Sequence, residues 1–152
     1  MNNEELKSAI LAIQPAATFD ESGEFLNVHI SSELLLPLML ELRNNKDFYF
    51  DYLFCETCID WKDHLMMVYH LTSKSLKHTL VVKGKISNRD NAEIESVAGI
   101  WKTAEFMERE VYELFGVKFL NHPDLRKLIL DDYWTGYPLR KDYSDPVNLI
   151  EY

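Results

Sequence analysis

The 152-residue sequence is poor in several residue types, and each shortage excludes a class of protein. Only two cysteines occur, which excludes a disulfide-stabilised scaffold and is typical of a reducing compartment. The 16 basic side chains are outnumbered by 25 acidic ones, so that the formal net charge is -9. Because phosphate binding needs clustered Lys and Arg, we expect no nucleic-acid partner.

Long hydrophobic runs are also missing. The longest apolar run extends from Leu34 to Leu40 and is interrupted by Pro37, whereas a bilayer-spanning helix needs about 20 residues. The start of the chain, Met1 to Glu5, is polar and acidic, unlike the basic and then apolar start of a signal peptide. We therefore expect a cytosolic protein without a targeting segment, which reaches a membrane only through partners.

What the sequence does have is enough apolar material for one core. The apolar fraction is 47%, and a chain of this length buries roughly two thirds of its unfolded surface as a single domain. Apolar residues at helical spacing predict three helices. Their expected ranges are Leu6 to Ile13, Ser31 or Ser32 to about Arg43 with Pro37 inside, and Trp101 to Leu114, ended by Gly116.

Strands are predicted from period-two patterns and turn residues. The first two form a hairpin, and the next three an antiparallel meander, in which we expect Phe48, Phe50, Tyr52 and Phe54 to share one face. Two short strands follow the third helix. The predicted ranges are Ala16 to Phe19, Glu24 to Ile30, Phe48 to Cys55, Leu65 to Leu71, Lys77 to Lys83, Val117 to Leu120 and Lys127 to Leu130.

These elements predict an α+β fold of two layers, with a mainly antiparallel sheet packed against helices. We expect one domain over residues 1–130 and an extended C-terminal tail over 131–152. The tail has no period, yet it carries several large apolar side chains that need a cover. These are Tyr133, Trp134, Tyr137, Leu139 and Tyr143.

The third helix is unusually rich in charge. Glu105, Arg109 and Glu113 repeat at i, i+4 and i+8, away from the apolar stripe, and are expected to form a solvated ladder. Glu108 and Glu110 lie at the two edges of the stripe, where a carboxylate needs a partner. The nearest basic groups beyond the helix are Arg126, Lys127, Arg140 and Lys141. The charges alone favour a structural network and a partner-binding surface equally.

Enzyme motifs have little support. Cys55 and Cys58 have the C-x-x-C spacing of redox and zinc sites, but they end a period-two run, so their sulfur atoms should point to opposite faces. A small redox or zinc protein built on them is therefore a weaker hypothesis than ordinary core cysteines. No phosphate-binding glycine loop and no G-x-S-x-G motif occurs. The histidines show no metal-binding spacing, although a hairpin could bring His70 and His78 close together.

One long run of residues resembles the signature of the C subunit of respiratory complex I, the proton-pumping NADH-quinone oxidoreductase. The run is Glu108-Arg109-Glu110, two residues, Glu113-Leu114-Phe115, six residues, His122, three residues, Arg126, one residue and Leu128-Ile129. The segment from Gly136 to Tyr143 is similar to the closing segment of that family. The similarity is strongest over 97–143 and weaker over 48–83.

The resemblance implies a bacterial, non-catalytic subunit of the hydrophilic arm, peripheral on the cytoplasmic side of the inner membrane. It implies packing against the large quinone-site subunit of the D type, with FMN and iron-sulfur clusters held by other subunits and no cofactor, metal or catalytic residue in this chain. A homologous subunit of an energy-converting hydrogenase, or of a related oxidoreductase with another donor, is the alternative. The implied signature and interface residues are Glu108, Arg109, Glu110, Glu113, His122, Arg126, Arg140 and Lys141.

Two features depart from the family pattern. Tyr137 stands before the Pro-Leu-Arg element, where histidine is often expected, and the chain ends nine residues after Tyr143. Cys55 and Cys58 match no feature of the family. The docking of the tail is the part of the resemblance that these departures affect.

Overall fold

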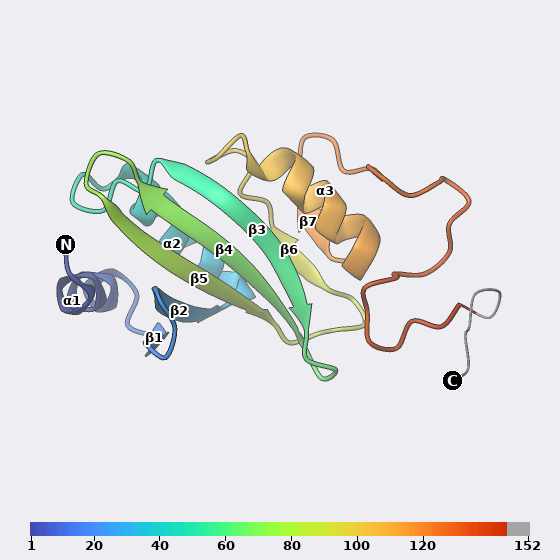
Figure 1. Ribbon diagram of the computed structural model, residues 1–152, viewed down its shortest axis with the longest axis horizontal. Coiled ribbons are helices and arrows are strands. Elements are labelled where there is room, and N and C mark those ends of the chain that lie inside the picture. The colour runs from blue at the N-terminus through green and yellow to red at the C-terminus, as the bar shows by residue number, and fades with distance from the viewer. Residues whose placement is uncertain (146–152) are drawn as a thin grey trace.

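The computed structural model of the chain describes residues 1–145, and its largest feature is a five-stranded sheet (Figure 1). The strand order is β1-β2-β5-β4-β3, in which only β2 and β5 are parallel. The predicted α+β class with a mainly antiparallel sheet is therefore confirmed. The strand bounds are β1 Thr18–Asp20, β2 Leu26–Ser31, β3 Tyr52–Asp60, β4 Leu65–Ser73 and β5 His78–Ile86.

Helices α1 (Asn3–Ile13) and α2 (Ser32–Asn44) precede β3 in the chain, and both match their predicted positions. The Asn2 side chain accepts a hydrogen bond from the Glu5 backbone N–H, and the Glu5 carboxylate accepts one from the Asn2 backbone N–H, so that the two residues form a capping box at the start of α1. Pro37 lies inside α2, as expected. Figure 1 shows α2 behind the sheet, where its Leu35, Met39 and Leu42 are fully buried.

A close approach between the sheet, α2 and the following segment occurs at Gly84 of β5. A Cβ atom at this position would lie 3.3 Å from the Ile94 side chain and 3.4 Å from the Leu35 side chain. Ile94 belongs to β6 (Glu93–Glu95), which pairs in parallel with β7 (Lys118–Leu120). Strand β7 was predicted, whereas β6 was not, because a single apolar residue between two glutamates gives no recognisable strand pattern, and because its pairing with β7 joins segments on either side of α3.

Helix α3 (Ala104–Phe115) lies between β6 and β7 in the chain and packs beside β3 (Figure 1). It ends at Gly116, whose φ of 73° is the left-handed cap that the sequence predicts. Trp101, just before the helix, is buried, and its indole Nε1 donates a hydrogen bond to the carbonyl oxygen of Phe50 at 2.9 Å. The helix is thereby joined to the segment that leads into β3.

That segment corrects one prediction. Strand β3 begins at Tyr52, and the aromatic residues around its start do not share a face: Phe48 and Phe50 are buried, whereas Tyr52 and Phe54 are exposed. Tyr49 has a left-handed φ of 38°, so the chain turns between the two buried rings instead of alternating. The period-two pattern of this region was therefore misleading.

A second correction concerns residues 127–130, which form no strand. After β7 the chain runs without regular secondary structure around the outer side of α3 (Figure 1). The predicted tail over 131–152 is irregular as far as it is described, and its last part, 146–152, lies outside the described residues.

Candidate interaction surface

The charged residues of α3 do not form a solvated ladder. Arg109 and Glu113 are 5% and 2% exposed, because the chain after β7 covers the side of the helix that was expected to face water. This is the main difference between the predicted and the observed helix. An i, i+4 pair of opposite charges indicates a solvent-exposed face only when no other segment lies over it.

Arg109 and Glu113 hold the covering segment by its backbone. The Arg109 guanidinium donates hydrogen bonds to the carbonyl oxygens of Arg126 and Lys127, at 3.0 and 2.9 Å. The Glu113 carboxylate accepts hydrogen bonds from three consecutive backbone N–H groups, all between 2.9 and 3.1 Å: those of Leu128, Ile129 and Leu130. We call this set of contacts the tail clamp. Hydrogen bonds to a charged partner are stronger than neutral ones, so the clamp fixes the path of residues 126–130.

Glu108 is fully buried and does not lie at the edge of the apolar stripe. Its carboxylate accepts hydrogen bonds from the Ser96 hydroxyl at 2.5 Å and from the Val97 backbone N–H at 2.6 Å. These two groups are the partners that the buried carboxylate requires. No basic side chain of the described tail pairs with it. Desolvation outweighs these hydrogen bonds and raises the pKa of Glu108 to about 7.

His122 closes the same region from the chain that follows β7. Its Nδ1 accepts a hydrogen bond from the Asp124 backbone N–H at 2.9 Å, so the ring proton lies on Nε2. Nε2 is 2.9 Å from the Glu105 carbonyl oxygen, to which it donates, and 3.6 Å from the Glu108 carboxylate. The ring joins α3 to the start of the covering segment and is a structural contact.

The basic residues of the covering segment and tail have other partners than the α3 carboxylates. Arg126 pairs with Asp124 at 2.9 Å. Lys127 donates through Nζ to carbonyl oxygens of the loop at 131–134. The Arg140 guanidinium donates to the carbonyl oxygen of Phe115, the last residue of α3, and lies 5.0 Å from the centre of the Tyr137 ring.

The tail packs against the end of α3 at Gly116. A Cβ atom there would lie 2.6 Å from the Tyr137 ring, so the ring packs directly on the glycine. The backbone N–H of Leu139 donates to the Leu114 carbonyl oxygen at 3.1 Å, which satisfies one of the free carbonyls at the helix end. Tyr137, which departs from the family pattern, thus has a defined place.

A second attachment of the tail involves two residues that no sequence pattern singled out, Asp60 and Arg89. Arg89 donates to Asp60 at the end of β3 at 2.8 Å and to Asp142 of the tail at 3.0 Å. Asp60 also accepts from the Lys141 backbone N–H at 2.9 Å. The hydrogen bonds from Arg89 hold the pKa of Asp60 well below its usual value. No local spacing marks these residues, because they lie far apart in the chain.

The tail and the covering segment before it, held in this way, present large apolar side chains to solvent. Tyr133 is 95% exposed and Ile129 is 67% exposed, which is unusual for such residues in one short segment. The exposed apolar residues on or beside the tail are Phe106, Leu128, Ile129, Tyr133, Trp134, Tyr137 and Leu139. We call them the tail surface. A surface of this composition on a fixed backbone is typical of a protein–protein interface.

Comparison with known proteins identifies the family. The sequence model described as "Respiratory-chain NADH dehydrogenase, 30 Kd subunit" matches residues 28–147. The chain belongs to this family. The resemblance to the C subunit of complex I is therefore confirmed, and α3 and all of the described tail fall inside the matched range.

Individual relatives agree with this assignment. The chain is 45% identical over 122 residues to the C/D subunit of NADH-quinone oxidoreductase from Phocaeicola vulgatus, covering 80% of this chain and 23% of that protein. It is 36% identical over 119 residues to the C subunit of the same enzyme from Citrifermentans bemidjiense, covering 76% and 72% of the two chains. It thus spans less than a quarter of the C/D relative but most of the separate C subunit.

A solved structure shares the fold. The chain is similar, with a TM-score of 0.74 and 25% identity, to a chain in the membrane-bound sulfane sulfur reductase, an archaeal respiratory membrane complex. The match covers 95% of this chain and 86% of the other. No helix in residues 1–145 has the length and apolar character to cross a bilayer.

In this member of the 30 Kd subunit family, the cysteine and histidine side chains do not come together in a site. Cys55 and Cys58 are free thiols of β3, and the alternating burial of that strand puts them on opposite faces. His70 lies opposite Val81 in the sheet register and His78 opposite Ser73, so the two rings are not paired. Among residues 1–145 no group of three His, Cys, Asp or Glu side chains is placed to hold a metal ion.

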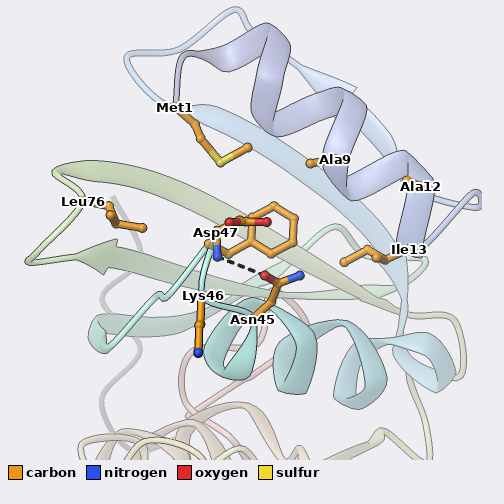
Figure 2. Close-up of a pocket in the computed structure, with 9 residues that line it drawn as sticks. Met1, Ala9, Ala12, Ile13, Asn45, Lys46, Asp47 and Leu76 are labelled. Atoms are coloured by element: carbon orange, nitrogen blue, oxygen red, sulfur yellow. Dashed lines mark hydrogen bonds between the residues drawn. The ribbon is translucent and has the colours of Figure 1, made fainter.

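The chain also has a surface hollow of about 550 Å³, which lies apart from α3. Figure 2 shows it between α1, which contributes Ala9, Ala12 and Ile13, and the loop after α2, with Leu76 on the opposite wall. Its polar lining includes the hydrogen bond from the Asp47 backbone N–H to Asn45 Oδ1 at 3.0 Å. It contains none of the predicted signature residues, so size alone does not locate the functional surface.

Proposed function

We propose that this chain is a non-catalytic structural subunit of NADH-quinone oxidoreductase, and that it binds the large D-type subunit through the tail surface. The observation that carries the proposal is the tail clamp. Buried charges at Arg109 and Glu113 fix a segment whose apolar side chains are exposed to solvent, which is what a preformed interface requires. Relatives in which C and D form one polypeptide support the same partner, because fusion keeps the two parts together.

In this proposal the chain contributes position and not chemistry. Electrons pass from NADH through FMN and iron-sulfur clusters of other subunits to quinone, while this chain supports the large subunit at the quinone site. The chain binds no cofactor itself and is peripheral, on the cytoplasmic side of the bacterial inner membrane. Its signature residues Glu108, Arg109 and Glu113 serve the internal structure, and the interface consists of the tail surface and its neighbours.

A second candidate keeps the same place in a different machine. The similarity to a chain of the membrane-bound sulfane sulfur reductase, an archaeal respiratory complex, supports a related membrane oxidoreductase that is not named as an NADH-quinone oxidoreductase. The tail surface and its partner class stay the same in both cases. The two candidates differ only in the subunits that take up electrons from the donor.

Co-purification tests the proposal. The chain is tagged at its N-terminus at native expression level, and the proteins recovered with it are identified and quantified. We expect stoichiometric recovery of a D-type large subunit. Recovery of an NADH-binding flavin subunit supports the first candidate, and its replacement by another donor-binding subunit supports the second. A chain that purifies without any large subunit contradicts both.

Two substitutions sharpen this test. Arg140→Ala removes the hydrogen bond to the Phe115 carbonyl oxygen and loosens the tail, and Glu110→Ala removes an exposed charge of α3. We expect each to lower recovery of the large subunit several-fold while circular dichroism of the isolated chain is unchanged. Glu24→Ala, in the exposed turn between β1 and β2, is the matched control and should leave recovery unchanged. Normal recovery with both variants would show that the interface lies elsewhere.

A further inference from the structure

A small cleft lies where β3, α3 and the tail meet. Its volume is about 50 Å³, and its lining includes Glu56 and Thr57 of β3, Glu110 and Leu114 of α3, and Leu139 of the tail. This is far below the roughly 300 Å³ of the smallest typical small-molecule sites, but it exceeds the space that one water molecule needs. The cleft fits the end of a side chain, and it borders the tail surface at the exposed Leu139.

Glu56 is the unusual residue of the cleft. It is only 5% exposed, and neither of its carboxylate oxygens has a hydrogen-bond partner within residues 1–145. The hydroxyl of Tyr69, directly opposite in the β3–β4 register, also has no partner within that range. Buried polar groups are nearly always paired, so a buried carboxyl group with two free oxygens indicates that a partner is missing.

The charges around Glu56 do not supply that partner. The ionisable groups that act on Glu56 or line the cleft are acidic or neutral: Glu108 and Glu110 on α3, Cys55 on β3 and Tyr69 on β4. The Arg140 guanidinium lies beside the cleft but donates to the carbonyl oxygen of Phe115. No Lys, Arg or His side chain of the described residues lines the cleft. Residues 146–152 contain no basic residue, so this end of the sequence cannot provide a cation either.

We propose that an arginine side chain of the large partner subunit enters this cleft and pairs with Glu56, with the Glu110 carboxylate at the mouth. The proposal rests on the proposed function and specifies the anchor of its interface. Arginine suits the site because its flat guanidinium forms two parallel hydrogen bonds to a carboxylate, and because arginine is enriched at the desolvated centres of interfaces. The apolar neighbours Leu114 and Leu139 can pack on the arginine methylenes.

In the free chain the cleft is ready for this partner without the cost of a buried charge. Burial, reinforced by Glu108, raises the pKa of Glu56 well above its usual value and so favours its neutral form, whereas a cation in the cleft favours its charged form. Association should therefore favour release of the Glu56 proton. The Glu108 carboxyl titrates nearby, so the contribution of Glu56 is obtained as the difference between the wild-type chain and a Glu56 variant.

The experiment uses Glu56→Gln in the tagged full chain, expressed in cells that lack the wild-type copy. Gln keeps the shape and neutrality of the protonated side chain but cannot form an ion pair. We expect unchanged thermal unfolding of the isolated chain and at least a tenfold loss of the large subunit that remains bound after a salt wash. The matched control, Glu24→Gln in the turn between β1 and β2, should retain wild-type recovery.

The outcomes separate the two proposals. If the wild-type chain and Glu24→Gln recover no large subunit, the proposed function fails. If both recover it and Glu56→Gln recovers it equally well, the arginine anchor is wrong and the cleft holds at most a bridging water. Should Glu56→Gln fail to fold, a structure of the wild-type assembled complex decides: a guanidinium within hydrogen-bonding distance of Glu56 supports the inference, and a cleft with only water overturns it.

Discussion

Helices α1 and α3 both carry charged residues at helical spacing, but the two sets of charges have different roles. In α1, Glu4 is exposed and pairs with Lys7 one turn away, as on any solvated helix. In α3, Arg109 and Glu113 have the same kind of spacing and are almost completely buried. The spacing therefore does not reveal which role applies. What decides it is whether another part of the chain returns to cover that face.

The return of the chain also explains where the apolar surface lies. The hollow beside α1 is wide and lacks the signature residues, whereas the tail over α3 is held at many points and exposes rings such as Tyr133. A segment that is fixed by charged hydrogen bonds loses little further freedom on binding. The comparison thus favours the α3 end as the binding end.

The largest expected effect comes from Glu113→Ala, which removes the acceptor of three backbone N–H groups. We expect the free energy of unfolding to fall by about 4 kcal/mol, because charged hydrogen bonds contribute about 1.5–3 kcal/mol each and part of this is regained from water. Chemical denaturation measures the change. Glu4→Ala in α1 is the control and should cost less than about 0.5 kcal/mol. Equal effects of the two substitutions would remove the distinction between the helices.

The next largest effect is a dependence of the unfolding free energy on pH, which arises from Glu108. Its folded-state pKa of about 7 is above the ordinary 4.5, so the folded protein binds this proton more tightly than the unfolded chain does. The stabilisation is complete below about pH 4.5 and is lost as the pH rises through 7. One pKa unit corresponds to about 1.4 kcal/mol, which predicts a loss of roughly 3 kcal/mol.

Glu108→Gln should remove this pH dependence, as measured by denaturation between about pH 4.5 and 8. Burial lowers the pKa values of His29, His70 and His78, which also contribute to the pH dependence, and Glu56 faces Glu108 from β3. The informative quantity is therefore the difference between the two pH profiles. Asp60 acts in the opposite direction and only at more acidic pH, because its pKa is lowered. Parallel pH profiles of the wild type and Glu108→Gln would show that ionisation of the buried Glu108 does not lower the stability.

A smaller effect is expected from Gly116→Ala at the end of α3. The residue needs a φ of 73°, and the new Cβ would meet the Tyr137 ring. We expect a loss of about 2 kcal/mol in unfolding free energy, consistent with left-handed strain plus displaced packing. Gly99→Ala, where a Cβ meets nothing within 4 Å, is the control. Hydrogen exchange should show the tail amide of Leu139 released in the first variant and unchanged in the second.

Much of the fold follows from the sequence, because its signals are local. The capping residue Asn2, the apolar repeats of α1 and α2 and the left-handed cap at Gly116 each depend on neighbours within one or two turns. The antiparallel meander of β3, β4 and β5 likewise follows from alternation and short turns. The helices and strands β4 and β5 were predicted close to their observed bounds, whereas β3, predicted over Phe48 to Cys55, is observed over Tyr52–Asp60.

The features that were missed depend on distant contacts. The strand predicted over 127–130 is absent because backbone N–H groups of this segment are taken by Glu113, far earlier in the chain. Asp60 and Arg89 meet across 29 positions, and no spacing rule marks them. The exposed face assigned to Arg109 was wrong for the same reason. The family signature indicated that Arg109 and Glu113 matter, but only the folded chain shows that they hold its own covering segment.

Hydrogen exchange of the free chain and of the purified complex tests the central claim most directly. Peptides from two regions are compared in both states: residues 126–143, which include the clamped tail, and α1, Asn3–Ile13. We predict that the tail peptides gain strong protection on assembly, whereas the α1 peptides keep the exchange rates of the free chain. Protection gained at α1 with none at the tail would contradict the account.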